Sequence, residues 1–308
     1  MHTNLNERVA IIDTRALGES NIVAAYLLTG KETALIDMGY HSSTQTVLNR
    51  LVELGIGPDG LDYLLPTHVH LDHSGSCGAL ARIFAQASVR VHPKGEPHLV
   101  DATALWKGAG ELFGKELMQN YGKPEPVEQK RIRIIRDEEV IDLGEGIVLR
   151  AVWTPGHASH HLSYEWEGFS SFFTGDAVGI RYPAFPILVP TTPPTSFNFE
   201  QTLESLERIR ACHPSEFYTP HFGVVEDANQ WVGRNIESLV RWKSMIEGMM
   251  EKRFSEKEIW ESLTLETCKE MGQPLSTMPA YLRISIKLSV LGFLRYLNKQ
   301  AQSESTSQ

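Results

Sequence analysis

The chain has 308 residues, of which 42% are hydrophobic, so it is long enough for one large domain with an addition or for two domains. Its formal net charge of −9 argues against a general nucleic-acid binder, which needs an excess of Lys and Arg, and against docking on anionic lipid. The polar residues 1–8 lack the apolar core of a signal peptide, and no apolar run is long enough to predict a membrane span. Cys77, Cys212 and Cys268 are far apart without a CxxC pair, so we expect a reducing, cytoplasmic location.

The N-terminal part predicts strands followed by a helix. Residues 8–14, 21–29 and 32–38 are apolar runs of strand length, and Gly30-Lys31 between the last two is a hairpin signal. Residues 42–54 carry apolar side chains at helical spacing and are followed by a glycine, so they predict a helix.

A cluster of metal-ligand side chains lies within residues 67–77, between an apolar strand and a predicted helix start. His68, His70, Asp72 and His73 occupy a six-residue stretch of it. Alternate residues of an extended segment point the same way, so the first two imidazoles are placed to share one metal, while the other two residues fall at the turn and can face a second ion. Three imidazoles and a carboxylate suit zinc, iron or manganese. The alternative, a polar loop with hydrogen-bonded histidines, does not account for so dense a cluster.

Residues 78–92 predict a helix and then a short strand. The pattern changes over residues 94–123, where glycines and scattered apolar positions predict one or two helices inserted at the edge of the site. Trp106, Phe113 and Met118 are candidates to line a substrate cleft. Because such side chains at helical spacing are more often core, we favour a packing role.

Strands dominate the following stretch. The predicted strands are residues 131–135, 139–143, 147–153, 162–166 and 169–174. The third ends at a Pro-Gly turn that exposes His157, and the fifth runs into Asp176. Residues 181–196 hold five prolines and predict an ordered loop over the face of the site.

The C-terminal part is mostly helical by its pattern. Asn198, with Gln201 three residues later, predicts the capped start of a helix, and a last strand over residues 217–221 ends at His221. Residues 229–252, 255–271 and 277–299 predict three more helices. The last is apolar over much of its circumference and must be covered by its own domain or by a second subunit, and residues 300–308 predict a disordered tail.

The stretch from His68 to His73 resembles the His-x-His-x-Asp-His signature of the metallo-β-lactamase superfamily, and the later motifs follow in the family's order. The resemblance implies one metal held by His68, His70 and His157, a second held by Asp72, His73 and His221, and Asp176 between them. It also implies that Asp37 supports the metal ligands, for which a plain strand-end turn is the equal alternative.

Seven of the twelve histidines stay outside the ligand set, among them His92, His98, His160 and His161. Many hydrolases of the family continue after the second motif with a Thr-Pro-Gly type of sequence, where this chain has His160 and His161. One of these two is a candidate to hydrogen-bond a ligand, and neither is predicted to bind metal. His92 and His98 lack a spaced partner, so we interpret them as hydrogen-bonded or exposed.

The fold implied by the resemblance is an α/β protein, a four-layer αββα sandwich with an added C-terminal helical region. The predicted domains are a catalytic domain over residues 1–228, with the helical insertion at about 94–123, then a helical extension over 229–299 and the tail at 300–308.

The function implied is that of a metal-dependent hydrolase, in which a water or hydroxide between two metal ions cleaves a small carbonyl ester, lactone or thioester, as in the lactonase-like and glyoxalase II-like branches. Asp72 and Asp176 are the predicted catalytic residues. No Gly-x-Ser-x-Gly motif and no Gly-rich phosphate loop occurs, so water is the expected nucleophile. The alternatives are a mono-iron oxidoreductase like the persulfide dioxygenases and a phosphodiesterase of the same superfamily.

The expected cofactors are two divalent metal ions, zinc first, with iron or manganese as alternatives. The expected partner is a small-molecule substrate, without nucleic acid or membrane. A homodimer through the C-terminal helices is a further expectation.

Overall fold

The computed structural model describes residues 8–185 and 187–306. The chain divides into two compact units, which are described separately. The first unit comprises residues up to Trp153, His160–Gly175 and Glu216–Val225; the second comprises Thr154–Ser159, Asp176–Ser215 and the chain from Glu226 onward. The predicted domain boundary at residue 228 remains a prediction, and the predicted polar N-terminal segment lies almost wholly outside the described residues.

The first unit holds two sheets. One has the strand order β1-β2-β3-β4-β5-β6, antiparallel from β1 to β3 and parallel from β3 to β6. Its strands are β1 (Val9–Asp13), β2 (Ala24–Thr29), β3 (Thr33–Ile36), β4 (Tyr63–Leu65), β5 (Ser88–Val91) and β6 (Ile132–Ile134). The predicted hairpin at Gly30 joins β2 to β3, where the Gly30 amide donates to the carbonyl oxygen of Glu32 at 3.1 Å.

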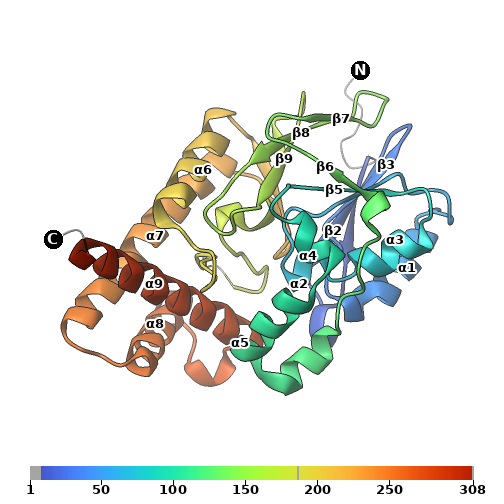
Figure 1. The fold of residues 1–308 in the computed structure, drawn as a ribbon. Coiled ribbons are helices and arrows are strands. Elements are labelled where there is room, and N and C mark those ends of the chain that lie inside the picture. Colours follow the sequence, from blue (N-terminus) through green and yellow to red (C-terminus); the bar gives the residue numbers. More distant parts are fainter. Residues whose placement is uncertain (1–7, 186, 307–308) are drawn as a thin grey trace. The chain divides into compact units, whose positions relative to one another are not determined.

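The other sheet has the order β12-β11-β10-β9-β8-β7 and is antiparallel except between β10 and β11. Its strands are β7 (Val140–Asp142), β8 (Val148–Trp153), β9 (Leu162–Trp166), β10 (Ser171–Phe173), β11 (Glu216–Thr219) and β12 (Gly223–Val225). Buried side chains from both sheets form one core, which includes Tyr26 and Leu28 from β2 and Tyr164 and Trp166 from β9. The two sheets therefore pack face to face (Figure 1), and the predicted α/β sandwich is confirmed.

Helices cover the opposite face of the first sheet and form the insertion. The helices of the first unit are α1 (Thr44–Glu53), α2 (Leu71–Ser74), α3 (Cys77–Ile83), α4 (Glu96–Val100) and α5 (Thr103–Tyr121). Val47 and Leu51 of α1 join Leu80 of α3 in a second buried cluster against β4 and β5. The predicted insertion consists of α4 and α5, and α5 is interrupted at Gly114, whose φ of 78° is not helical.

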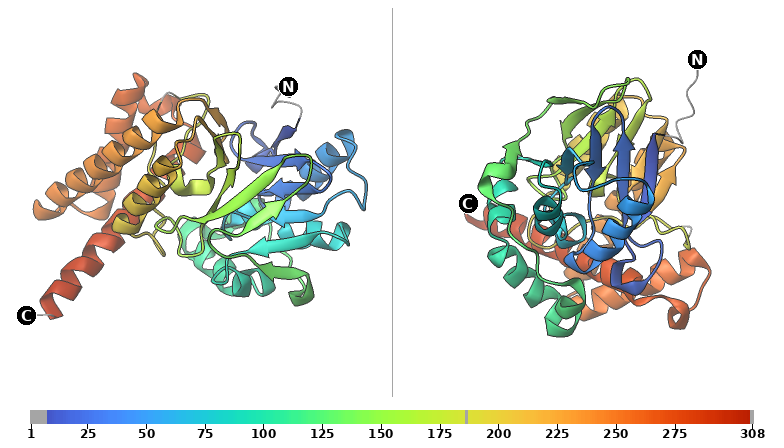
Figure 2. Two further views of the ribbon diagram at one scale, coloured as in Figure 1. Left: turned by 90° about the horizontal axis from the view of Figure 1, so that it is seen from above. Right: turned by 90° about the vertical axis from the view of Figure 1, so that its right-hand side faces the viewer.

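The second unit is helical, with loops that carry part of the site. Its helices are α6 (Phe199–Ala211), α7 (Ala228–Glu251), α8 (Glu256–Met271) and α9 (Ala280–Thr306), of which α9 contacts both α7 and α8 (Figure 2). Asn198 caps α6 as predicted, because its side chain accepts a hydrogen bond from the Gln201 amide at 2.9 Å. The apolar face of α9 is covered within this unit, by a buried set that includes Trp242 of α7 and Leu263 of α8.

Two features differ from the sequence-based expectations. α9 continues to Thr306 instead of giving way to a disordered tail at residue 300, because Gln300 still hydrogen-bonds to Glu200 and Tyr296. Residues 307 and 308 of the predicted tail lie outside the described residues. The strand β12 was not predicted.

No helix in the described part of the chain is both long and apolar enough to cross a membrane.

Candidate metal centre

The cluster predicted from residues 67–77 lies at the end of β4, where the chain leaves the sheet and turns into α2. His70 is the residue before α2 and has extended φ and ψ angles of −65° and 156°, whereas Asp72 and His73 are within the helix. A Cβ built at Gly75 would lie 2.7 Å from the backbone nitrogen of His41, so only glycine lets the segment after the motif approach so closely. His68 and His73 are fully buried.

The imidazoles of His68 and His70 converge as the alternation of an extended segment predicts. Nε2 of His68 lies 2.9 Å from Nδ1 of His70. The ring of His73 lies next to that of His68, with the two ring centroids 4.1 Å apart. Three imidazoles therefore lie side by side just after β4, and imidazole nitrogens are common metal ligands.

One complete set of three candidate metal ligands lies in the first unit. Ligand atoms of Asp72, His73 and His221 are all within 4.8 Å of one another. Oδ2 of Asp72 is 3.5 Å from Nε2 of His73 and 3.6 Å from Nε2 of His221. His221 follows β11, and its Nδ1 is 3.3 Å from the carbonyl oxygen of Ile22. The structure thus brings together the three residues that the sequence assigned to one metal, although they are far apart in the chain.

Asp37 supports this arrangement from the end of β3. Its carboxylate is 2% exposed, and Oδ1 accepts hydrogen bonds from the amide and hydroxyl of Thr67 at 2.8 Å and 3.0 Å. Oδ2 lies 2.9 Å from Nδ1 of His73. A carboxylate at Nδ1 keeps the proton on that nitrogen and leaves the lone pair of Nε2 for a metal. Of the two interpretations of Asp37, the contacts favour the supporting role over the plain turn.

The remaining two predicted ligands, His157 and Asp176, belong to the second unit. Both are 5% exposed, and Nε2 of His157 lies 3.5 Å from Oδ2 of Asp176. Nδ1 of His157 is 3.1 Å from the carbonyl oxygen of Thr191, and the Thr191 hydroxyl donates to the carbonyl oxygen of Asp176. The sequence did not point to Thr191, because no local pattern links it to residues 15 or more positions away.

The four additional histidines have different surroundings. His161 is fully buried, its ring centroid is 5.0 Å from that of His68, and a Cβ built at Gly175 would lie 2.8 Å from its Cε1. His160 is partly exposed, with its ring centroid 6.1 Å from that of His70 and also 6.1 Å from that of His98. His92 stacks on Trp153 at the far end of β8, which agrees with a structural role. Both members of the His160-His161 pair therefore lie beside histidines of the first unit that are predicted metal ligands.

The insertion packs against the motif through an apolar cluster. Met118 and Tyr121 of α5 are buried with Leu71, which stands between two predicted ligands in the sequence. Tyr121 stacks on Tyr40 with ring centroids 4.3 Å apart. Burial raises the pKa of the Tyr121 phenol, and the charge of Asp72 raises it further. The packing role that we favoured for Met118 is confirmed.

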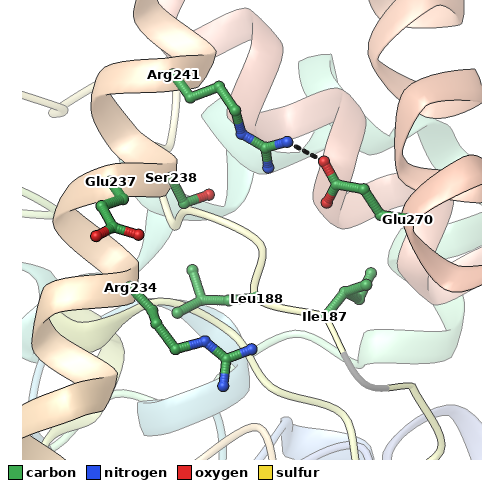
Figure 3. Close-up of a pocket in the computed structure, with 7 residues that line it drawn as sticks. All are labelled: Ile187, Leu188, Arg234, Glu237, Ser238, Arg241 and Glu270. Atoms are coloured by element: carbon green, nitrogen blue, oxygen red, sulfur yellow. Dashed lines mark hydrogen bonds and ion pairs between the residues drawn. The ribbon is translucent and has the colours of Figure 1, made fainter.

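The second unit has a pocket of about 270 Å³ beside α7 and α8 (Figure 3). It is lined by Ile187, Leu188, Arg234, Glu237, Ser238, Arg241 and Glu270. Its two arginines are accompanied by two carboxylates, and Arg241 forms an ion pair with Glu270. None of its residues is a predicted metal ligand.

The donor set of the first unit fits a transition-metal centre. It consists of imidazole nitrogens and carboxylate oxygens, the ligands that zinc, iron and manganese take from proteins. Burying imidazoles so close together is unfavourable unless a proton or a cation lies between their facing lone pairs. The histidine Nδ1 atoms turned toward Asp37 and Thr191 add the hydrogen bonds that commonly orient metal-binding imidazoles.

Comparisons with known proteins agree with this assignment. A metallo-β-lactamase fold-containing protein of Sulfurisphaera tokodaii is 30% identical over 208 residues, which cover 66% of this chain and 74% of the relative. An atrochrysone carboxyl ACP thioesterase of Aspergillus fumigatus is 29% identical over 215 residues, 69% of this chain but only 54% of the thioesterase. The crystal structure of an archaeal superfamily protein from Sulfolobus tokodaii matches with a TM-score of 0.70 and 25% identity, over 93% of this chain and 98% of that one.

The sequence profile of the metallo-beta-lactamase superfamily matches residues 19–221. That range runs from the first sheet to His221 and includes every predicted ligand. With the sandwich of two sheets and the histidine cluster at the end of β4, it shows that this chain belongs to the metallo-β-lactamase superfamily.

Proposed function

We propose that this protein is a metal-dependent hydrolase with two metal ions, zinc first and iron or manganese as alternatives. His68, His70 and His157 would hold one ion, Asp72, His73 and His221 the other, and Asp176 would bridge them. The observation that carries the proposal is the set of Asp72, His73 and His221, whose ligand atoms lie within 4.8 Å of one another. A mono-iron oxidoreductase, which needs two histidines and one carboxylate, leaves this second set without a role.

The bound metal ions would lower the pKa of a water molecule toward neutrality and polarise the carbonyl oxygen of the substrate. The chain's own residues prepare the site for this chemistry. Asp37 holds the proton of His73 on Nδ1, which leaves Nε2 as the donor atom. Asp72 is 22% exposed at its side chain, more than the buried histidines around it, so it can pass a proton to a leaving group as well as bind metal.

The proposed substrate is a small carbonyl ester or thioester, with a lactone as the next candidate. The thioesterase of Aspergillus fumigatus supports the thioester, and it is one of the relatives whose match covers more than two thirds of this chain. Tyr182, the nearest tyrosine after Asp176, is 4% exposed and its hydroxyl is 3.1 Å from that of Ser285. Lactone hydrolases of this superfamily often have a tyrosine just after the bridging Asp, whereas the Tyr182 hydroxyl is engaged within the second unit, so we rank the lactone behind the other two substrates.

A substrate panel tests this function. Protein stripped of metal and reloaded with zinc, manganese or iron should hydrolyse thioesters or esters, and Asp176→Asn should reduce the rate by at least ~100-fold, because the carboxylate would contact both metals. Asp59→Asn, at an exposed loop position, is the matched control and should leave the rate unchanged. Oxygen uptake with a persulfide substrate, without hydrolysis of any ester, would instead favour the oxidoreductase.

We also propose a cytoplasmic protein that forms a homodimer through its C-terminal helices and acts on a small molecule without nucleic acid or membrane. Val240 on α7 and Leu265 on α8 support the dimer, because they are large apolar side chains that are 50% and 49% exposed. Sedimentation of the whole chain tests the dimer, and a monomer at micromolar concentration would exclude it.

A further inference from the structure

The C-terminal helix α9 contacts a loop whose residues hydrogen-bond to His157 and Asp176. Thr191 and Thr192 of this loop are both buried; Thr191 contacts the two predicted ligands, and Thr192 contacts α9. The Thr192 hydroxyl donates to the carbonyl oxygen of Ser289 at 2.7 Å, and the Ser289 hydroxyl donates to the carbonyl oxygen of Pro190. The backbone around the two threonines is thus hydrogen-bonded to the middle of α9.

Gly292, one turn further along α9, allows this approach. A Cβ built there would overlap the carbonyl oxygen of Thr192 and would lie 2.6 Å from its carbonyl carbon. Real Cβ atoms essentially never approach that closely, and the obstacle is backbone, so any larger residue must push the loop away from the helix. The neighbouring Val290 and Phe293 are fully buried, so α9 itself has little freedom to retreat.

The same short loop contacts both predicted ligands of the second unit. The carbonyl oxygen of Thr191 lies 3.1 Å from Nδ1 of His157, and the Thr191 hydroxyl donates to the carbonyl oxygen of Asp176. A displacement of the Thr191 backbone would therefore turn the imidazole and shift the carboxylate together. The neutral Nδ1–H of a metal-binding histidine needs such an acceptor to keep Nε2 directed at the metal.

We propose that α9 positions the metal ligands His157 and Asp176 through Thr191 and Thr192, with Gly292 as the residue that permits the contact. The C-terminal helical region is then part of the metal centre's support. This inference rests on the proposed metal centre, but it concerns how the ligands are held and does not depend on which substrate is cleaved.

Glycine variants of the full-length protein test it. Gly292→Ala should weaken zinc affinity by about 10–100-fold, measured by competition with a chromophoric chelator, and should change the visible absorption of the cobalt-loaded protein. Gly248→Ala is the matched control, because Gly248 lies in α7 and a Cβ there would meet nothing within 4 Å. It should leave the affinity and the spectrum as in the wild type.

A second pair of variants keeps the test decisive if Gly292→Ala does not fold. Thr191→Val removes the hydroxyl at nearly constant volume and should weaken zinc affinity, whereas Thr191→Ser keeps the hydroxyl and should restore it. A purely structural role would lower the melting temperature of the metal-free protein without changing the affinity. Wild-type affinity in folded Gly292→Ala or Thr191→Val would overturn the inference, whereas a wild-type protein that binds no zinc would refute the metal centre itself.

Discussion

Replacing Asp37 by asparagine tests whether this residue orients the predicted ligand His73, separately from its contribution to the stability of the fold. Asp37 has a φ of 53°, a left-handed conformation that asparagine tolerates well, so the backbone is unaffected. The amide oxygen can still accept both hydrogen bonds from Thr67, but the amide NH₂ then faces Nδ1 of His73. Two donors cannot pair, so the His73 proton must move to Nε2, the atom that faces Asp72.

The size of the effect follows from the contacts that are lost. A buried hydrogen bond to a charged acceptor is replaced by one from the neutral amide to Nδ1 of His73, so we expect the free energy of unfolding to fall by about 1 kcal/mol. Zinc affinity should fall by about 10–100-fold, because Nε2 can bind metal only after losing its proton. Chelator competition measures the affinity, and urea denaturation of the metal-free protein measures the stability.

The control for this variant is Asp62→Asn. Asp62 also accepts a backbone hydrogen bond, from the Thr33 amide at 2.8 Å at the start of β3, but no predicted ligand is its partner there. Because its amide oxygen can still accept this hydrogen bond, the variant should keep its zinc affinity and lose little stability. If Asp37→Asn binds zinc as tightly as the wild type, the reasoning about the His73 proton is refuted.

Three further predictions concern the fold. Gly75→Ala should lower the melting temperature by several degrees, because a Cβ there would lie 2.7 Å from a backbone nitrogen. Gly57→Ala is the control, because a Cβ there would meet nothing within 4 Å, and equal melting temperatures of the two variants would contradict the close packing after the motif. Burial raises the pKa of the Cys77 thiol to about 12, so this thiol should resist alkylation at pH 8 until the protein unfolds, and rapid modification of the native protein would count against its burial. Hydrogen bonds from Ser255 lower the pKa of Glu258 at the start of α8. The Glu258 carboxylate therefore stabilises the protein above its unfolded-state pKa, and this stabilisation is lost as the pH falls through its folded-state pKa. The melting temperatures of the wild type and Glu258→Ala should differ at pH 7 and converge in acid.

Local patterns were sufficient for most of the fold. The apolar runs around Tyr26 and Tyr164 and the helical spacing in α1 and α7 depend on neighbouring residues, so the strands and helices could be predicted from sequence. β12 is only three residues long and lies directly after a ligand, too short for a pattern to be recognised. The extension of α9 past residue 300 depends on contacts with Glu200, which a local pattern cannot reveal.

The candidate site likewise contains residues that a local pattern predicts and residues that only long-range contacts reveal. His68, His70, Asp72 and His73 form one dense segment, and their chemistry is apparent from spacing alone. Asp37, Thr191 and the α9 contacts act through hydrogen bonds between segments far apart in the chain. The role of Asp37 could only be stated as one of two alternatives from sequence, and the contact of Gly292 could not be anticipated at all.

Elemental analysis of protein purified without chelator, and of its His221→Ala variant, tests the proposed two-metal centre most directly. We expect about two equivalents of zinc, iron or manganese in the wild type and about one in the variant, because His221 belongs to only one of the two proposed ligand sets. One equivalent of iron in both proteins would contradict the account and favour the mono-iron oxidoreductase.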